Sequence, residues 1–411
     1  MIYLLLAGYA LFWLYRHWED KKNYWKRRGI NGPEPEMFFG NAKALRDYEN
    51  PRSLVIRNWT RQYGKVYGIH EGFKKILVVS DLETTNELLV KKFDHFTNRI
   101  KFLLQSDEDT PKTNLIQASG MHWKRLRALG SYAFTNKALK NIQLTVENSS
   151  SIMTEELKRR SELGEVNMLE FYQEFTLDVI CKIALGQKDV EMFKNPLMDL
   201  CRNIFSAPQS YKFTNILIFL PFIKKPMIFL LGKLARYRKH PYLNLMRDVE
   251  VAVEQRKKER EAGASSSGDF IDIFLDAEVE SNDLEESKVS RKLLFDEIVS
   301  QCIVMLLAGF ETTANSLSYL THFLANHPDV QEKIYEEVQA VFPHEINYED
   351  LSELKYTEAA IKESLRHYPL GSFVVSRECQ KRTTLGGMQL EVGDSVLTDT
   401  WSLHMDKTIW G

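Results

Sequence analysis

The sequence predicts a mainly α-helical protein with small β-sheets, the α+β class. Apolar residues recur at helical spacing over residues 171–185, and a longer helical run covers about residues 292–326 and ends before Pro328. By contrast, residues 66–81 and 373–403 contain short β-prone runs separated by glycine turns. With 411 residues, 44% of them hydrophobic, the chain is long enough to bury a large core around these elements.

The chain begins with an uncharged segment, MIYLLLAGYALFWLY, which is followed by a basic segment that starts at Arg16. These flanks predict an N-terminal membrane anchor over residues 1–18. The apolar part is shorter than the roughly 20 residues that a spanning helix needs. A cleaved signal peptide is the alternative, but the basic region that opens such a peptide is missing, and no clear cleavage site follows.

Residues 19–42 predict a basic linker that Pro33 and Pro35 make stiff, because proline cannot continue a helix. Residues 43–411 then form the globular domain. The positive charges after the anchor predict that this domain stays on the cytosolic side of the membrane.

The first expected element of the globular domain is a β-hairpin over residues 66–81. Helical segments follow, and they are interrupted by the apolar residues 216–231, where Pro221 and Pro226 break the helical pattern. This segment predicts a loop over an apolar cavity or a dip into the membrane surface. GASSSG at residues 263–268 predicts a solvent-exposed loop.

Two helices are expected after the long apolar run. One begins at Pro328, a favoured first helical residue, and continues to about Val341. The other runs from Leu354 to His367 and ends before Pro369.

The net charge of −2 gives no electrostatic support for a nucleic-acid partner. The four cysteines are scattered and form no C-x-x-C pair, and no histidine lies at metal-ligand spacing from any of them. They fit a reducing compartment, and the sequence predicts no structural metal site. The cysteines are Cys181, Cys201, Cys302 and Cys379.

Two polar residues, Glu311 and Thr312, interrupt the long apolar run just after Ala308 and Gly309, from which only Phe310 separates them. A threonine in a helix can simply bond to the carbonyl four residues earlier, and a glutamate can simply face solvent. Burying a carboxylate without a partner, however, costs several kcal/mol, so an acid retained here predicts a proton relay or a wet cavity. Gly309 removes a side chain and would let a flat group approach the backbone closely.

A second pattern is the basic segment WKRLR. Trp123 and Arg127, four residues apart, share one helix face, whereas Lys124 and Arg125 are expected to turn outward. Taken alone, the segment is equally typical of an amphipathic basic helix on a protein surface.

A third pattern is the i, i+3 pair of Glu363 and Arg366, which is common on helix surfaces and specifies little by itself. The chain thus contains, among others, W-x-x-x-R at Trp123 and Arg127, A-G-x-E-T at Ala308 to Thr312, E-x-x-R at Glu363 to Arg366, F-T-N-R at Phe96 to Arg99, and Arg377. In this order and spacing, these segments together resemble the cytochrome P450 superfamily of heme-thiolate monooxygenases, in its microsomal drug- and lipid-oxidising branch.

The resemblance implies that heme b is the cofactor and that basic and aromatic side chains hold its propionates. It implies further that Ala308 and Gly309 leave room for dioxygen and substrate, and that Glu311 and Thr312 are catalytic and deliver protons. The residues that would hold the propionates are Arg99, Trp123, Arg127 and Arg377.

The resemblance also assigns roles outside the oxygen side of the site. Glu363 and Arg366 would form a buried core pair, and Phe373 and Val374 would line a substrate pocket roofed by residues 216–231. It implies insertion of one oxygen atom into apolar small molecules of the xenobiotic, steroid or fatty-acid type.

The resemblance names partners and a location as well. Electrons from NADPH would come through a flavoprotein reductase that docks on a basic face, for which Lys124 and Arg125 are candidates. The protein would lie at the cytosolic face of the endoplasmic reticulum membrane, held there by its N-terminal anchor.

One departure from the family concerns the iron ligand. The sequence ends HMDKTIWG, whereas the family continues into F-x-x-G-x-R-x-C-x-G, which carries the ligating cysteine, and into a last helix. None of the four cysteines is expected to replace that ligand, so a truncated chain without it is expected to be inactive, because thiolate donation promotes O–O cleavage. The alternatives are a non-enzymatic, membrane-anchored fragment that binds apolar ligands or the reductase, and an incomplete gene model of an active enzyme.

Overall fold

The computed structural model describes residues 2–47, 49–102, 105–106, 108–187, 190–206, 217, 223–238, 240–266, 268–277, 293–342 and 347–411. The chain forms two compact units, and residues 43–411 contribute to both. Unit 1 comprises Met1–Asp107, Pro208–Leu231 and Gly371–Gly411, and unit 2 comprises Glu108–Ala207 and Gly232–Leu370. The expected class, mainly helical with small sheets, is confirmed.

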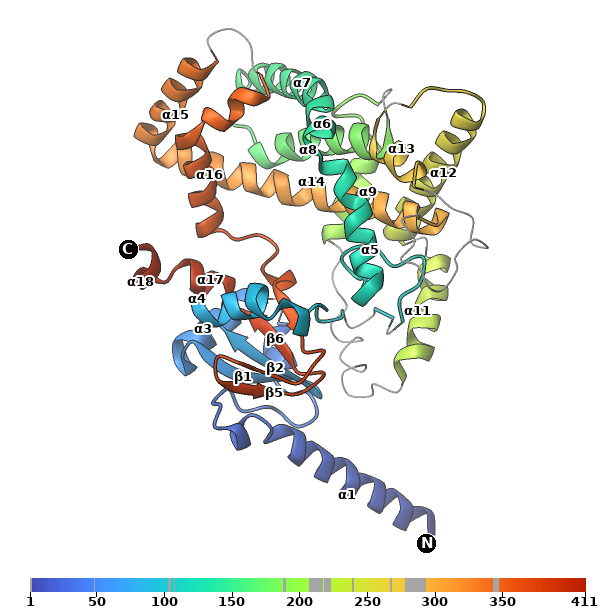
Figure 1. Ribbon diagram of the computed structural model, residues 1–411, viewed down its shortest axis with the longest axis vertical. Coiled ribbons are helices and arrows are strands. Elements are labelled where there is room, and N and C mark those ends of the chain that lie inside the picture. Colours follow the sequence, from blue (N-terminus) through green and yellow to red (C-terminus); the bar gives the residue numbers. More distant parts are fainter. Residues whose placement is uncertain are drawn as a thin grey trace. The chain divides into compact units, whose positions relative to one another are not determined.

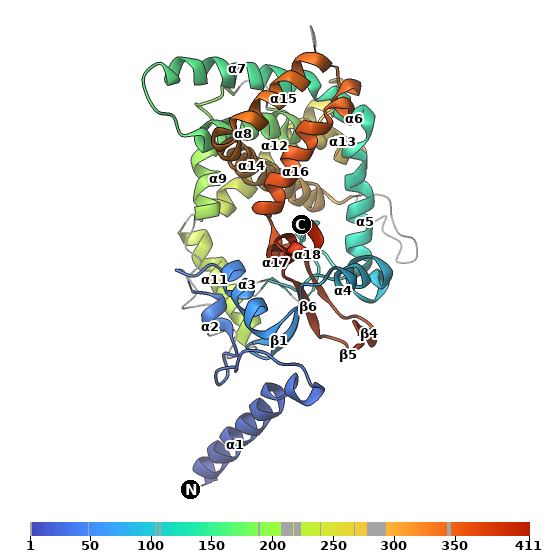
Figure 2. The same ribbon diagram turned by 90° about the vertical axis from the view of Figure 1, so that its left-hand side faces the viewer.

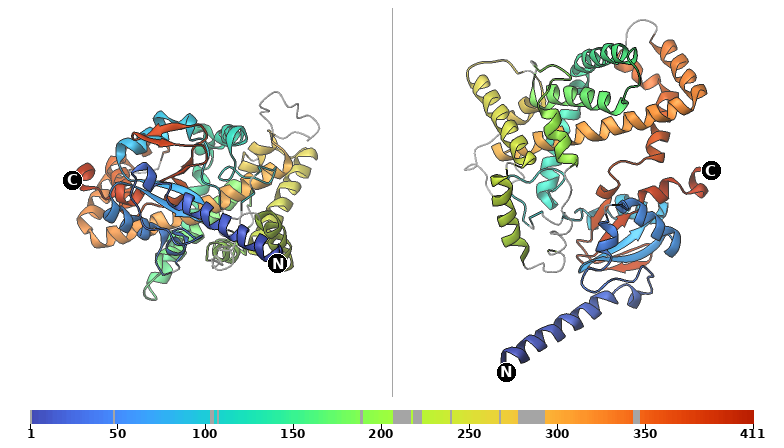
Figure 3. Two further views of the ribbon diagram at one scale, coloured as in Figure 1. Left: turned by 90° about the horizontal axis from the view of Figure 1, so that it is seen from below. Right: turned by 180° about the vertical axis from the view of Figure 1, so that it is seen from behind.

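Unit 1 contains a four-stranded sheet and a separate two-stranded hairpin. The sheet has the order β1-β2-β6-β3, with β2 parallel to β6 and the other neighbours antiparallel, so that blue and red strands lie side by side in Figure 3. Its strands are β1 (Val66–Glu71), β2 (Lys74–Val79), β3 (Ser376–Glu378) and β6 (Ser395–Thr398), and the hairpin pairs β4 (Thr383–Leu385) with β5 (Met388–Leu390).

The hairpin expected over residues 66–81 is confirmed. Glu71 pairs with Lys74, which leaves Gly72 and Phe73 as a two-residue turn, and Gly72 has the positive φ of 62° that such turns favour. Ile76 to Val79 are fully buried, because β2 has a strand on each side and apolar side chains on both faces.

In unit 1, helix α3 contacts β1 of the sheet and also contacts α2 and α17. At the C-terminal end of α1, Trp18 is buried and its ring lies 6.0 Å from the Phe38 ring and 6.1 Å from the Phe73 ring. The helices are α1 (Ile2–Lys22), α2 (Ala42–Leu45), α3 (Arg52–Tyr63), α4 (Leu82–Asn86), α17 (Thr400–His404) and α18 (Lys407–Trp410).

Unit 2 is helical, and its long helix α14 packs along α8 (Figure 1). Beside one end of α14, α15 and α16 contact each other and α14 (Figure 2). The helices are α5 (Gly120–Gly130), α6 (Asn136–Asn141), α7 (Gln143–Ser161), α8 (Met168–Leu185), α9 (Leu197–Ser206), α12 (Pro241–Glu261), α13 (Phe270–Leu275), α14 (Phe295–Asn326), α15 (Pro328–Val341) and α16 (Lys355–His367).

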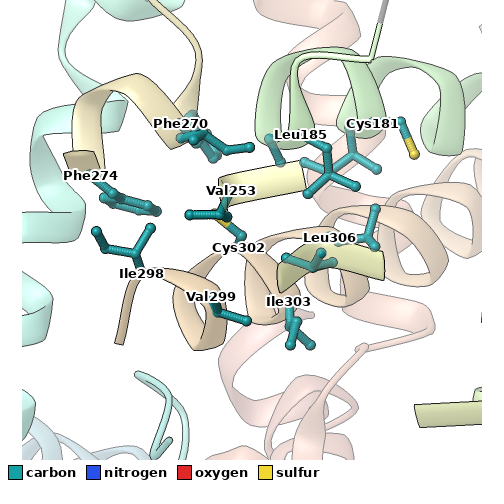
Figure 4. Packing of buried hydrophobic residues seen from close by; sticks show 14 of the residues in the cluster. Cys181, Leu185, Val253, Phe270, Phe274, Ile298, Val299, Cys302, Ile303 and Leu306 are labelled. Carbon is teal, nitrogen blue, oxygen red and sulfur yellow. The ribbon is translucent and has the colours of Figure 1, made fainter. Parts of the chain in front are cut away.

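The core of unit 2 forms around the first half of α14. Cys302 and Leu306 lie among apolar side chains of α8, α12 and α13, including Val253 and Phe270 (Figure 4). By length and composition, α14 is the one helix of the described residues that could cross a membrane, but 56% of its apolar window is buried inside the protein, as in a core helix.

Residues 216–231 differ from the expectation where they are described. Residues 207–216 and 218–222, which include Pro221, lie outside the described residues. Pro226 does not break a helix, because α11 (Lys224–Tyr237) begins two residues before it. A proline in the first helical turn removes an N–H that has no partner within the helix.

Candidate active site

The turn of α14 from Ala308 to Thr312 has one exposed side, on which both of these residues lie. The Thr312 hydroxyl donates a hydrogen bond of 2.7 Å to the Ala308 carbonyl oxygen, four residues earlier. This is the bond to the carbonyl four residues earlier that any threonine in a helix can form. Because the hydroxyl hydrogen is used in that bond, Oγ1 of Thr312 presents its lone pairs as acceptors.

Glu311, the next residue, is half-buried and bonded at both carboxylate oxygens. Oε2 accepts from the Gln173 amide at 3.1 Å, and Oε1 accepts from the Asn315 amide at 3.1 Å. Sequence reasoning missed both partners. Asn315 lies one helical turn after Glu311, a spacing that can be read from the sequence, whereas Gln173 is 138 positions away on α8 and gives no such signal.

Gly309 has a different neighbour from the one expected. A Cβ atom at this position would lie 2.9 Å from Cδ1 of Ile180, so the space that the glycine leaves is used by α8. The Thr176 hydroxyl donates to the Phe310 carbonyl oxygen at 3.0 Å in the same contact. The expectation that the missing side chain leaves room for a flat group is therefore corrected: it lets α8 and α14 approach each other.

Trp123 and Arg127 lie on α5, as expected. Trp123 is half-buried against the core of unit 2, and Arg127 is exposed, as is Lys124. The expectation that Arg125 turns outward is wrong, because it pairs with the buried carboxylate of Glu297, with Nη1 3.0 Å from Oε2.

Glu297 draws Arg125 inward because it lies buried in the first turn of α14. His122 Nε2 lies 3.0 Å from Oε1 of Glu297, and Oε2 accepts from the Leu294 backbone N–H at 2.9 Å. Burial alone would raise the pKa of Glu297, but the bonds from His122 and Arg125 outweigh it and hold that pKa below its usual range. Of the two basic residues expected to face outward, Lys124 is exposed and Arg125 is not.

Glu363 and Arg366 form the expected pair on α16, with Arg366 Nη2 2.7 Å from Glu363 Oε1. The pair is not a buried one, because the Glu363 side chain is 57% exposed. The physical reason is its position on the helix: α16 faces its neighbours through Thr357, Ala360 and Ser364, and Glu363 lies away from that stripe.

Unit 1 holds a second group of the predicted residues. Arg377 lies on β3. Arg99 lies beside this strand, because the carbonyl oxygen of the preceding residue, Asn98, accepts from the Glu378 backbone N–H at 2.8 Å. Val374 is half-buried in the single turn Ser372–Val374, and the side chain of Phe373 lies outside the described part.

These two arginines fit an anionic group. Arg377 Nε is buried and has no hydrogen-bond partner among the described residues. Burial, and then the nearby charge of Arg99, lower the pKa of Arg377 below its usual value, so the structure places two cations close together. Carboxylates such as the heme propionates would relieve that repulsion and accept the guanidinium hydrogens.

No cysteine among the 411 residues is suited to be a thiolate ligand as the structure stands. All four thiols are buried. Burial raises the pKa of Cys181, Cys302 and Cys379, and burial with the charge of Glu311 raises that of Cys201 to about 12. A thiol has to lose its proton to bind iron, and these surroundings oppose that loss.

Comparisons with known proteins agree with these features. The Cytochrome P450 family model matches residues 30–411. The proteins similar to the chain include three from Caenorhabditis elegans. "Putative cytochrome P450 CYP13A3" is 43% identical over 410 residues, which is 95% of this chain and 78% of that protein. "Putative cytochrome P450 CYP13A5" is 40% identical over 435 residues, which is 99% of this chain and 82% of that protein. "Putative cytochrome P450 CYP13A7" is 41% identical over 416 residues, which is 95% of this chain and 79% of that protein. Similarity of this degree and extent means that the chain belongs to the cytochrome P450 family.

Proposed function

We propose that this chain takes part in heme-dependent monooxygenation of apolar small molecules of the xenobiotic, steroid or fatty-acid type, with electrons delivered from NADPH by a reductase. Its family consists in general of heme monooxygenases. The observation that carries the proposal is the buried Nε of Arg377, which has no partner among the described residues and lies near a second arginine.

The chain's own residues would divide the work between holding the cofactor and moving protons. Arg99 and Arg377 of unit 1 would hold the propionates of heme b, the role that the family resemblance also gives to Trp123 and Arg127. Heme, when bound, supplies the iron at which dioxygen is reduced. Thr312 would pass protons through its Oγ1, and Glu311 would supply them, because its carboxylate lies on the next residue of the same helix turn. Ala308, which is small and exposed, would leave room beside Thr312.

The location that we propose is the cytosolic face of the endoplasmic reticulum membrane. The support comes from α1, on which Tyr9, Phe12 and Trp13 are exposed and basic residues follow in the last turn. Aromatic side chains of this kind favour the membrane–water interface.

We propose further that these 411 residues alone do not activate dioxygen. The support is that the four thiols are buried in surroundings that oppose thiolate formation. The same observation favours a second candidate function, in which the chain binds apolar ligands or the reductase without turnover.

The experiment is a heme titration of the purified 411-residue chain, followed by the reduced carbon monoxide difference spectrum. Arg377→Gln should weaken heme binding by about tenfold to a hundredfold, because charge-assisted hydrogen bonds of about 1.5–3 kcal/mol are lost. Arg382→Gln is the matched control, since its side chain is 65% exposed in the same unit. It should bind heme as the unsubstituted chain does.

The spectrum tests the second part of the proposal. We expect no thiolate-type Soret band, and its presence would show that one of the four cysteines ligates iron and would overturn the claim of inactivity. Equal heme affinity for Arg377→Gln and the unsubstituted chain would show that Arg377 does not hold a heme propionate. Reductase that copurifies with the chain but drives no oxidation would support the second candidate function.

A further inference from the structure

A line of polar side chains crosses unit 2 from α9 through α8 to α14. The guanidinium Nε of Arg202 on α9 donates to Oε1 of Gln173 at 2.9 Å. Gln173 Nε2 in turn donates to Oε2 of Glu311 at 3.1 Å. Three helices therefore contribute to the surroundings of one carboxylate.

The chemistry of the three groups fixes the direction of the amide. Arginine has only donors, so the oxygen of Gln173 has to face Arg202. The nitrogen of Gln173 then has to face Glu311, whose carboxylate in its ionised form has only acceptors. Reversing the amide would set nitrogen against guanidinium and oxygen against carboxylate, which would cost both hydrogen bonds.

Packing keeps this amide in place. Gln173 is 8% exposed, so little water can replace either of its partners. One turn further along α8, the Thr176 hydroxyl donates to the Phe310 carbonyl oxygen, the residue before Glu311. Both contacts attach the same face of α8 to the same turn of α14, so the amide and the carboxylate are held at a fixed separation.

We propose that Gln173, oriented by Arg202, is a positioning residue that fixes the orientation of the Glu311 carboxylate beside Thr312. This inference rests on the proposed function in one respect, namely that the positioned carboxylate serves in proton delivery. The amide itself passes no proton. The Gln173 amide donates to Oε2 and the Asn315 amide donates to Oε1, so the carboxylate is held in one orientation beside Thr312.

The other titratable group facing this carboxylate from α9 is Cys201, next to Arg202. Burial first, and then the charge of Glu311, raise the pKa of this thiol to about 12. Cys201 therefore stays neutral at physiological pH, so Arg202 is the charged group that α9 brings to Gln173.

The test follows the hydrogen bonding of the Glu311 carboxylate directly by infrared difference spectroscopy at a fixed pH. Spectra of Glu311→Gln are subtracted from those of the parent protein, which isolates the carboxylate band of this one residue. The same subtraction in the Gln173→Leu background should give a shifted band, because Oε2 loses a hydrogen bond. Arg202→Met should shift the band in the same direction, since the amide loses the partner that orients it.

Gln255→Leu is the matched control, because Gln255 also donates to a glutamate, Glu259 at 2.9 Å, but on the exposed surface of α12. It should leave the Glu311 band where it is. An unshifted band in both Gln173→Leu and Arg202→Met, in proteins whose circular dichroism matches the parent, would overturn the inference. The readout needs no heme, so failure of the chain to bind heme would count against the proposed function and leave this result intact.

Discussion

At the scale of single residues, buried polar atoms without a partner separate into two kinds. Arg377 keeps its charge and lies beside another cation, which points to an anion. His70 on β1 is buried too, and neither of its ring nitrogens has a hydrogen-bond partner among the described residues. Here burial, and then the charge of Lys75, lower the pKa of the imidazole to about 4, so His70 stays neutral.

His70 should therefore make stability depend on pH. Its pKa is about 6.5 in the unfolded chain and about 4 in the folded one, so the unfolded state takes up the proton first as the pH falls. The stabilisation is complete above pH 6.5 and is lost between about pH 6.5 and 4, by up to about 3 kcal/mol. In His70→Leu that loss should be absent from the free energy of unfolding, measured in urea at pH 7 and pH 4.5.

Carboxylates also titrate in this range, so the informative quantity is the difference between variant and parent. The exposed His322 on α14 provides a control, and His322→Leu should follow the parent at both pH values. Parallel curves for His70→Leu and the parent would show that His70 does not titrate in this way.

At the scale of elements, the contact between α8 and α14 depends on a small residue meeting a branched one. The Cβ that Gly309 lacks would come within 2.9 Å of Cδ1 of Ile180. Interiors packed this closely do not accept an additional methyl group without a shift of the neighbour.

A double-mutant cycle can measure that contact. Gly309→Ala should be destabilised by crowding against Ile180, and Ile180→Val, which removes Cδ1, should relieve it. The double variant should therefore be more stable than the sum of the single effects by about 0.5–3 kcal/mol in urea unfolding. Gly232→Ala with Ile180→Val is the matched cycle, because nothing lies within 4 Å of a Cβ at Gly232. Additive effects in the Gly309 cycle would refute the contact.

The same helices show how far the sequence predicts elements and where it stops. Pro328 and Val341 bound α15 as expected, because proline is favoured at the first helical position and the rule is local. The sequence predicts that Gly309 leaves room for a flat group, yet a glycine in a helix permits the approach of any neighbour, and only the fold determines that this neighbour is Ile180. Likewise Arg125 has outward spacing on its own helix, but Glu297 on another helix recruits it.

The candidate site is predictable to the same limit. Ala308, Glu311 and Thr312 are visible as polar and small residues within an apolar run. Their hydrogen-bond partners divide by distance along the chain: Asn315 follows from helical spacing, whereas Gln173 requires knowledge of which helices pack together. Periodicity within a helix says nothing about its neighbour.

At the scale of the whole molecule, α1 combines two roles along its length. Its first part carries exposed aromatic residues such as Phe12 and Trp13, whereas Trp18 near its end is 2% exposed against unit 1. Removal of residues 2–15 should therefore reduce flotation with phospholipid vesicles and leave the free energy of unfolding unchanged. Trp18→Ala in the full chain should cost about 3–5 kcal/mol of unfolding free energy, as expected for a buried tryptophan.

Trp13→Ala is the control for the second effect, because Trp13 is 56% exposed on the same helix. It should unfold as the parent does. Undiminished flotation after removal of residues 2–15 would contradict a membrane role for this segment, and an unchanged stability of Trp18→Ala would contradict its role in unit 1.

Each unit contains a buried thiol whose alkylation rate can report how often that unit opens. Cys379 is fully buried in unit 1, and Cys302 is fully buried in the core of unit 2. A thiol reagent reaches such a side chain only when the surrounding structure opens, so the rate of alkylation reports how often that structure opens. Mass spectrometry that resolves the two cysteine peptides would time the opening of the sheet and of the helical core separately, in one sample and without any added label.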